Sequence, residues 1–143
     1  FDFAKVVEAS KDNPVFYVQY AHARIASLGR KAAEAGISLA SAADLSLLDT
    51  EELGLIKVAG QFPRVIEAAA LAHEPHRIAF YLHDLASAFH ASWNRGNDDP
   101  AKRYLVEDRP DVTRARLELA NAVGRVLKNG LSLMGVEAAD ELR

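Results

Sequence analysis

The sequence predicts an all-α bundle of about five or six helices. Apolar residues recur at helical spacing along most of the chain, whereas the period-2 alternation of half-buried strands is hard to find. With 50% hydrophobic and 26% charged residues among 143, the composition is that of a soluble globular protein. A chain of this length supports one hydrophobic core, so we expect a single domain over residues 1–143.

Two helices are predicted before residue 36. Residues 1–10 form a short helix, and residues 14–35 form a long one that begins at Asn13-Pro14. Proline suits the first helical position because the N–H that it lacks would have no helical partner there, and Gly36 is placed to end the helix. One face of the long helix carries a narrow apolar seam, formed by Val18, Ala21, Ile25, Leu28 and Ala32.

Two short helices and a long one are predicted in the middle of the chain. Thr50 begins a helix that continues to Val58, and Gln61-Phe62-Pro63 interrupts it and begins another. The long helix runs from about Glu74 to Trp93, with Pro75 in its first turn. Its apolar face is formed by Ile78, Leu82, Leu85 and Phe89.

The remaining chain is predicted as an irregular region followed by a last long helix. Residues 95–100 are expected to form a loop because of their turn chemistry, and residues 109–111 close the same region. The last helix runs from Val112 to about Met134. No repeat, low-complexity tract or linker interrupts this order, which again favours one domain.

The composition excludes several classes of protein. The chain has no cysteine, which removes disulfides, zinc knuckles and thiol nucleophiles. No apolar run approaches the about 18 residues of a membrane span and no signal peptide is recognisable, so we expect a cytoplasmic location. A net charge of −3 and a pI near 5.9 argue against non-specific coating of nucleic acid. Because the chain begins at Phe1 instead of methionine, we expect it to be part of a longer polypeptide.

Catalytic and metal-binding motifs are absent from the sequence. There is no glycine-rich phosphate loop, no Gly-x-Ser-x-Gly and no His-Glu-x-x-His. His76, His83 and His90 repeat every seven residues and share one helix face, but residues two turns apart lie about 10 Å apart along the axis. Two such histidines cannot share one ion, so we predict no metal and no catalytic residue, and we interpret them as core or surface histidines.

Tyr17, Tyr20 and Arg24 form the most unusual pattern. Their spacing of i, i+3 and i+7 places two phenols and a guanidinium in a stripe beside the apolar seam. This combination suits unpaired nucleotides, whose bases stack on aromatic or guanidinium planes while the cation meets phosphate. The alternative is that the tyrosine rings pack in the bundle and Arg24 pairs with an acid.

Three stretches of the sequence resemble one known family. Residues 12–25, with the run Pro-Val-Phe-Tyr-Val-Gln-Tyr-Ala-His-Ala-Arg, resemble the opening of the C-terminal anticodon-binding domain of arginyl-tRNA synthetase, the DALR-type helical domain. Residues 74–90 resemble that family's central helix, followed by Trp93-Asn94 where many members carry Tyr-Asn. Residues 116–136 resemble its closing helix, and together the stretches span essentially the whole chain in the family's order.

The resemblance implies a bundle of the class I synthetase anticodon-binding type, which binds the anticodon stem-loop of arginine tRNA. Ligation of arginine with ATP and Mg would belong to a separate catalytic domain, because signatures of the His-Ile-Gly-His and Lys-Met-Ser-Lys-Ser kind are absent here. We therefore expect a domain without a cofactor that charges no tRNA by itself. Its expected partners are arginine tRNA and the catalytic domain of the parent arginine-tRNA ligase, and it is expected to be a monomer.

The resemblance places the anticodon contacts on Tyr17, Tyr20, Arg24 and Arg30 of the first long helix and on Trp93. Arg30 lies roughly 120° around the helix from Arg24, so we expect it to reach a neighbouring phosphate or another base. Trp93 stays near the apolar face of its helix, so packing in the core is the alternative for this residue. The alternative function is a helical protein-interaction module that receives a partner helix at the Tyr17 and Tyr20 edge.

Charge is distributed unevenly along the chain. The stretch from Ala101 to Gly130 is locally positive, which is compatible with an RNA face or with an ordinary solvated helix face. The segment from Asp44 to Glu52 carries acids and no base, and we expect it to face away from RNA. The basic residues of the positive stretch are Lys102, Arg103, Arg109, Arg114, Arg116, Arg125 and Lys128.

Overall fold

The computed structural model describes residues 13–39 and 42–141, and within them it confirms the all-α prediction. The helix expected over residues 1–10 lies outside the described residues. No helix of the described part is long and apolar enough to cross a membrane. The α-helices are α2 (Pro14–Glu34), α3 (Thr50–Ala59), α4 (Phe62–Ala72), α5 (His76–Asp98) and α6 (Pro110–Leu133), and two 3-10 turns are η1 (Leu45–Leu47) and η2 (Pro100–Lys102).

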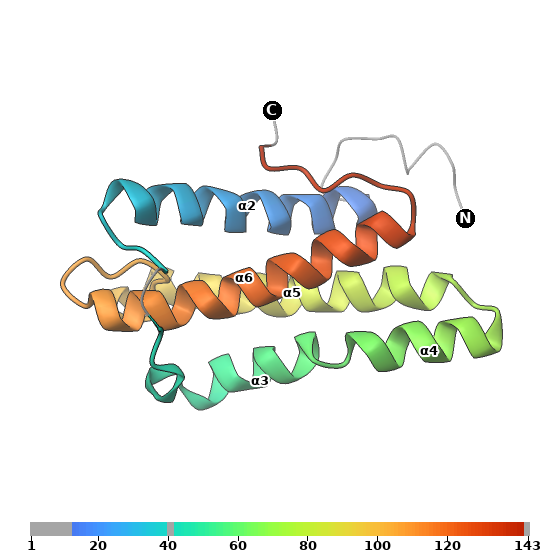
Figure 1. The fold of residues 1–143 in the computed structure, drawn as a ribbon, viewed down its shortest axis with the longest axis horizontal. Coiled ribbons are helices and arrows are strands. Elements are labelled where there is room, and N and C mark those ends of the chain that lie inside the picture. The colour runs from blue at the N-terminus through green and yellow to red at the C-terminus, as the bar shows by residue number, and fades with distance from the viewer. Residues whose placement is uncertain (1–12, 40–41, 142–143) are drawn as a thin grey trace.

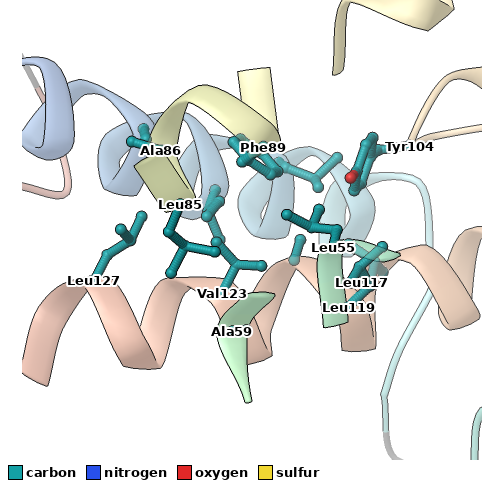
Figure 2. Packing of buried hydrophobic residues seen from close by; sticks show 14 of the residues in the cluster. Leu55, Ala59, Leu85, Ala86, Phe89, Tyr104, Leu117, Leu119, Val123 and Leu127 are labelled. Carbon is teal, nitrogen blue, oxygen red and sulfur yellow. The ribbon is translucent and has the colours of Figure 1, made fainter. Parts of the chain in front are cut away.

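Helix α5 lies at the centre of the bundle and contacts the other four α-helices. In Figure 1, α2 runs along one side of the α5 and α6 pair, while α3 and α4 follow each other along the opposite side. The core is formed by residues of α2, α3, α5 and α6. Figure 2 shows part of it, including Leu85 and Phe89 of α5 and Val123 and Leu127 of α6, all fully buried. Burial of these side chains is the main force that holds the helices together.

Side chains satisfy backbone groups at the start of α2 and at the end of α3. The Asn13 side chain accepts hydrogen bonds from the N–H groups of Val15 and Phe16 at the start of α2. At the end of α3, the Tyr81 hydroxyl of α5 lies 2.7 Å from the carbonyl of Val58 and 3.0 Å from that of Ala59, so it can donate to either. Burial raises the pKa of Tyr81 to about 12, which keeps this hydroxyl protonated.

The structure corrects the predicted loop over residues 95–100, because α5 continues to Asp98. Gly96 is buried in this last turn, and a Cβ there would lie 2.8 Å from Cγ and 3.0 Å from Cα of Arg103. Glycine at position 96 therefore allows close packing against the following segment, and it does not form a turn. Pro110 is likewise the first residue of α6 and not the end of a loop, as its fixed φ suits that position.

Charged side chains join the N-terminus of α3 to other parts of the bundle. Asp49 and Glu52 form a capping box, in which each carboxylate accepts the backbone N–H of the other residue at 2.9 to 3.0 Å. The second Asp49 oxygen accepts hydrogen bonds from Arg95 of α5 at 2.6 Å and from Lys102 of η2 at 3.0 Å. Burial alone would raise the pKa of Asp49, but these donors together hold it well below its usual range.

Arg116 of α6 completes this charged group. Its Nε donates to Glu52 Oε2 at 2.9 Å, and its Nη1 donates to the carbonyls of Ala101 and Arg103 at 2.7 and 2.6 Å. Both members of the ion pair are buried, and together they connect α3, α6 and the segment that follows η2. Arg116 therefore does not contribute to a solvent-facing positive stretch, because its charge is buried and paired with Glu52. Lys102 is half-buried and pairs with Asp49.

Breaking this ion pair should destabilise the fold strongly. Arg116→Met leaves the buried Glu52 carboxylate without its partner, so the free energy of unfolding should fall by about 3–5 kcal/mol in urea titrations followed by circular dichroism. Arg125→Met, an exposed position on the same helix, is the matched control and should change stability by less than about 0.5 kcal/mol. Adding Glu52→Gln to Arg116→Met should restore part of the loss, since the amide retains the capping acceptor without the charge. Equal stability of the Arg116 and Arg125 variants would contradict the assignment.

Candidate functional site

An open cavity of about 480 Å³ lies between α2, the last turns of α5 and the C-terminal segment. Of the five predicted site residues, Tyr20, Arg24, Arg30 and Trp93 line this cavity, and Tyr17 does not. The helical spacing and the fold thus bring four of the predicted residues together in one place. The remaining lining residues are Ala23, Ser27, Leu28, Lys31, Asp140 and Glu141.

The Arg24 guanidinium lies between two aromatic rings. Its Cζ is 5.0 Å from the centroid of the Tyr20 ring and 4.9 Å from that of Trp93, both within cation–π range. Its Nη2 donates to the Tyr20 hydroxyl at 2.8 Å. Among the described residues no carboxylate oxygen lies within 4.0 Å of Arg24, so the expected alternative of an acid partner is not what the structure shows.

Trp93 both lines the cavity and packs against the core. Its ring lies 5.6 Å from that of the buried Tyr104, with 24° between the planes, and 6.1 Å from that of Phe89. The Tyr104 hydroxyl shares a hydrogen bond of 2.7 Å with Ser92, and burial raises the pKa of Tyr104 to about 12. The core-packing alternative for Trp93 is therefore what the structure shows for one part of the ring, while Arg24 lies over the ring at the cavity wall.

Tyr17 lies beside the cavity and not in its lining. It is half-buried against α5, with ring centroids 4.9 Å from His83 and 5.1 Å from His90. Tyr20 is different, since 41% of its surface is exposed. The two phenols of the predicted stripe thus have different environments, one packed against histidines and one open to solvent.

His90 of α5 is the buried neighbour of Arg24, and the sequence analysis did not identify it as part of the site. Its Nδ1 lies 3.1 Å from Arg24 Nη1. A guanidinium can only donate, so Nδ1 accepts and the imidazole is neutral with its proton on Nε2. Burial and then the charge of Arg24 lower the pKa of His90 to about 4. The available signal was the spacing of His90 and Trp93, which places both on the same face of α5.

The segment after α6 returns along α2 (Figure 1). Its residues Asp140 and Glu141 line one side of the cavity. The Gln19 amide donates to the carbonyl of Glu137 at 2.9 Å, and His22 Nδ1 lies 2.7 Å from the carbonyl of Ala139. Arg30 Nη2 donates to the carbonyl of Asp140 at 3.4 Å, so the segment uses backbone oxygens and leaves the Arg30 charge without a carboxylate partner among the described residues. Sequence periodicity gave no signal for this contact, because the segment is irregular.

A second open cavity, of about 660 Å³, adjoins the first and shares Leu28, Lys31 and Trp93 with it. Its other walls come from the end of α5 and from residues 100 and 103–108. The described residues contain no group of three histidine, cysteine, aspartate or glutamate side chains that could hold a metal ion. The first cavity is lined by aromatic rings, cations and, on the C-terminal segment, Asp140 and Glu141.

Comparisons with known proteins agree on one family. The DALR anticodon binding domain matches residues 18–142. The arginine–tRNA ligases of Novosphingobium aromaticivorans and Beijerinckia indica are 65% and 58% identical, over 99% and 100% of this chain and 24% and 25% of their own length. The structure of Thermus thermophilus arginyl-tRNA synthetase superposes with a TM-score of 0.80 at 34% identity, over 99% of this chain and 23% of that one. The chain thus spans about a quarter of the length of these relatives.

The lowered pKa of His90 predicts a specific loss of stability in acid. The unfolded chain binds a proton at His90 near the ordinary histidine pKa of 6.5, whereas in the folded chain this pKa is about 4. The contribution of neutral His90 to the free energy of unfolding is therefore complete above pH 6.5 and declines as the pH falls towards 4, by about 2–3 kcal/mol.

Urea titrations between pH 7 and pH 4 measure this effect. The parent chain should lose stability more steeply than His90→Asn, and the exposed His76→Asn should follow the parent. Asp49 does not confound the window, because its lowered pKa affects stability only as the pH falls through and below its ordinary value of 3.8. Parallel profiles for the parent and His90→Asn would contradict the assignment.

Proposed function

Because the chain belongs to the DALR anticodon binding domain family, we propose that it binds the anticodon stem-loop of arginine tRNA. The observation that carries this proposal is the placement of Arg24 between the rings of Tyr20 and Trp93 at the wall of an open cavity. Unpaired bases stack on aromatic and guanidinium planes, and a guanidinium without a carboxylate partner is available for phosphate or a base edge.

Each proposed site residue has a distinct part in binding. Tyr20 presents an exposed ring for stacking, and its hydroxyl proton is free to donate because the oxygen accepts from Arg24. Arg24 supplies a planar cation with further N–H groups, and Arg30 supplies a second cation for phosphate. Trp93 gives the cavity an aromatic wall, and Tyr17 supports the site from the adjacent part of the same helix edge.

We further propose that residues 1–143 form one DALR-type anticodon-binding domain of a longer arginine-tRNA ligase in the cytoplasm. The relatives are about four times as long as this chain, and the signatures of ATP-dependent activation are absent from its sequence. ATP and Mg would therefore be used by a catalytic domain that also contacts this one, and the chain itself would bind RNA as a monomer without a cofactor. Purified chain should accordingly charge no tRNA with arginine in the presence of ATP.

Binding should depend on the identity of the central anticodon base. Fluorescence anisotropy with a labelled arginine anticodon stem-loop should show about tenfold tighter binding than with a stem-loop changed at that base, because a base edge needs matching donors. Raising the salt concentration should weaken both complexes, since cations at the cavity contact phosphates. Equal affinity for the two RNAs would indicate that the chain binds RNA through charge alone and does not recognise this base. Failure to bind either RNA would favour a protein-interaction module instead.

Tyr20 and Arg24 should be needed for binding but not for folding. Tyr20→Ala removes a stacking platform and Arg24→Ala removes a fixed cation, so each should weaken stem-loop binding about tenfold or more. The melting temperature should stay near that of the parent for Tyr20→Ala, because Tyr20 is exposed. For Arg24→Ala it should fall by only a few degrees, because the buried His90 Nδ1 loses its donor but no ion pair is broken. Arg64→Ala, exposed on α4 across the bundle, is the matched control. A large drop in melting temperature together with normal RNA binding would show that both residues have a structural role and contradict the prediction.

A further inference from the structure

The Arg24 guanidinium is held along one edge by two acceptors. Its Nη1 donates to His90 Nδ1 at 3.1 Å and its Nη2 donates to the Tyr20 hydroxyl at 2.8 Å, while Trp93 lies over its face at 4.9 Å. A guanidinium with both Nη groups engaged cannot turn freely about its Nε–Cζ bond or swing into another rotamer. Its remaining N–H groups therefore point in fixed directions at the cavity wall.

His90 is an unfavourable residue for stability at this position. It is 7% exposed, and its Nε2 is buried with no hydrogen-bond partner among the described residues. The Nδ1 contact with Arg24 requires the proton to be on Nε2, so the unpartnered atom is a buried N–H, which is unfavourable. An apolar side chain of similar size would avoid this penalty. What the imidazole adds over such a side chain is the acceptor at Nδ1.

Aromatic neighbours fix the orientation of the imidazole. The ring of His90 lies 5.1 Å from Tyr17, 5.4 Å from Tyr20 and 5.8 Å from Phe89, measured between centroids. Two of these rings come from α2 and one from α5, so the imidazole is enclosed by the helix pair that also carries Arg24. Nδ1 is therefore directed at the guanidinium by packing and does not depend on the ligand.

We propose that His90 is a positioning residue, whose Nδ1 holds the Arg24 guanidinium in the orientation that binds a nucleotide. An arginine side chain that is free in solution must be ordered when it binds, and that loss of freedom weakens binding. With His90 present, the Arg24 side chain is already ordered before the nucleotide binds. The inference rests on the proposed RNA-binding function for its ligand, whereas the orientation of Arg24 is a property of the free chain.

Three His90 variants separate the acceptor from the packing. His90→Leu removes the acceptor and should weaken stem-loop binding by about threefold to tenfold. In His90→Asn the amide oxygen occupies the place of Nδ1, and binding should return to within about twofold of the parent. His90→Gln places its oxygen where Nε2 was, one bond too far, and should bind as weakly as His90→Leu. The matched control is His76→Leu, an exposed histidine on the same helix, which should bind as the parent does.

A double-mutant cycle tests whether His90 acts through Arg24. In an Arg24→Ala background, His90→Leu should cause no further loss of binding, since there is no guanidinium to position. An equal loss in both backgrounds, or unchanged binding of His90→Leu alone, would overturn the proposal. If a leucine variant fails to fold, the asparagine and glutamine pair decides the question, because both side chains are amides, and equal binding by the two would also overturn it.

Nitrogen-15 NMR of the free chain gives a readout that does not need RNA. The Arg24 Nη signals should show slow rotation in the parent and in His90→Asn, and averaged signals in His90→Leu. Identical Arg24 signals in the parent and His90→Leu would contradict the proposal even if RNA binds. If the parent chain binds no stem-loop, the proposed function fails, and the NMR comparison still decides whether His90 orients Arg24.

Discussion

The buried ion pair between Glu52 and Arg116 is the constraint on which this end of the bundle depends. Glu52 uses one oxygen to cap α3 and the other to bind the arginine of α6, so a single side chain fixes where α3 begins and how it meets α6. Arg116 also binds the carbonyls of Ala101 and Arg103, which holds the segment after η2 against the core. The net stability that such a buried pair adds is small, but removal of one partner leaves an uncompensated buried charge.

That arrangement extends to the cavity through a series of packed rings. The segment held by Arg116 carries Tyr104, whose buried ring stacks on Trp93, and Trp93 also contacts the Arg24 guanidinium. His90 and Tyr20 complete the fixation of Arg24 from the α2 and α5 side. The site is thus pre-formed by the fold, with a cation and aromatic faces in place before any ligand arrives, which reduces the entropy lost on binding.

The parts of the fold that local signals encode were predictable from the sequence, and those that depend on distant contacts were not. The sequence correctly predicted that helices begin at Pro14 and at Thr50, because the preferences of residues for the first turn of a helix are local. The last turn of α5 was missed since packing of Gly96 against Arg103 outweighs its turn-like composition. Four of the five proposed contacts line one cavity because three share a helix, but the His90 contact joins residues 66 positions apart and has no local signature.

The fluorescence of Trp93 tests the central claim most directly, because it is the single tryptophan of the chain and lies at the wall of the cavity. When an unlabelled arginine anticodon stem-loop is added, the emission of Trp93 should change. The change should reach its plateau at the same RNA concentration at which binding measured by anisotropy is saturated. That result would place the RNA at the Tyr20, Arg24 and Trp93 cavity. Saturable binding with unchanged Trp93 emission would contradict the account, since the RNA would then occupy another surface of the bundle.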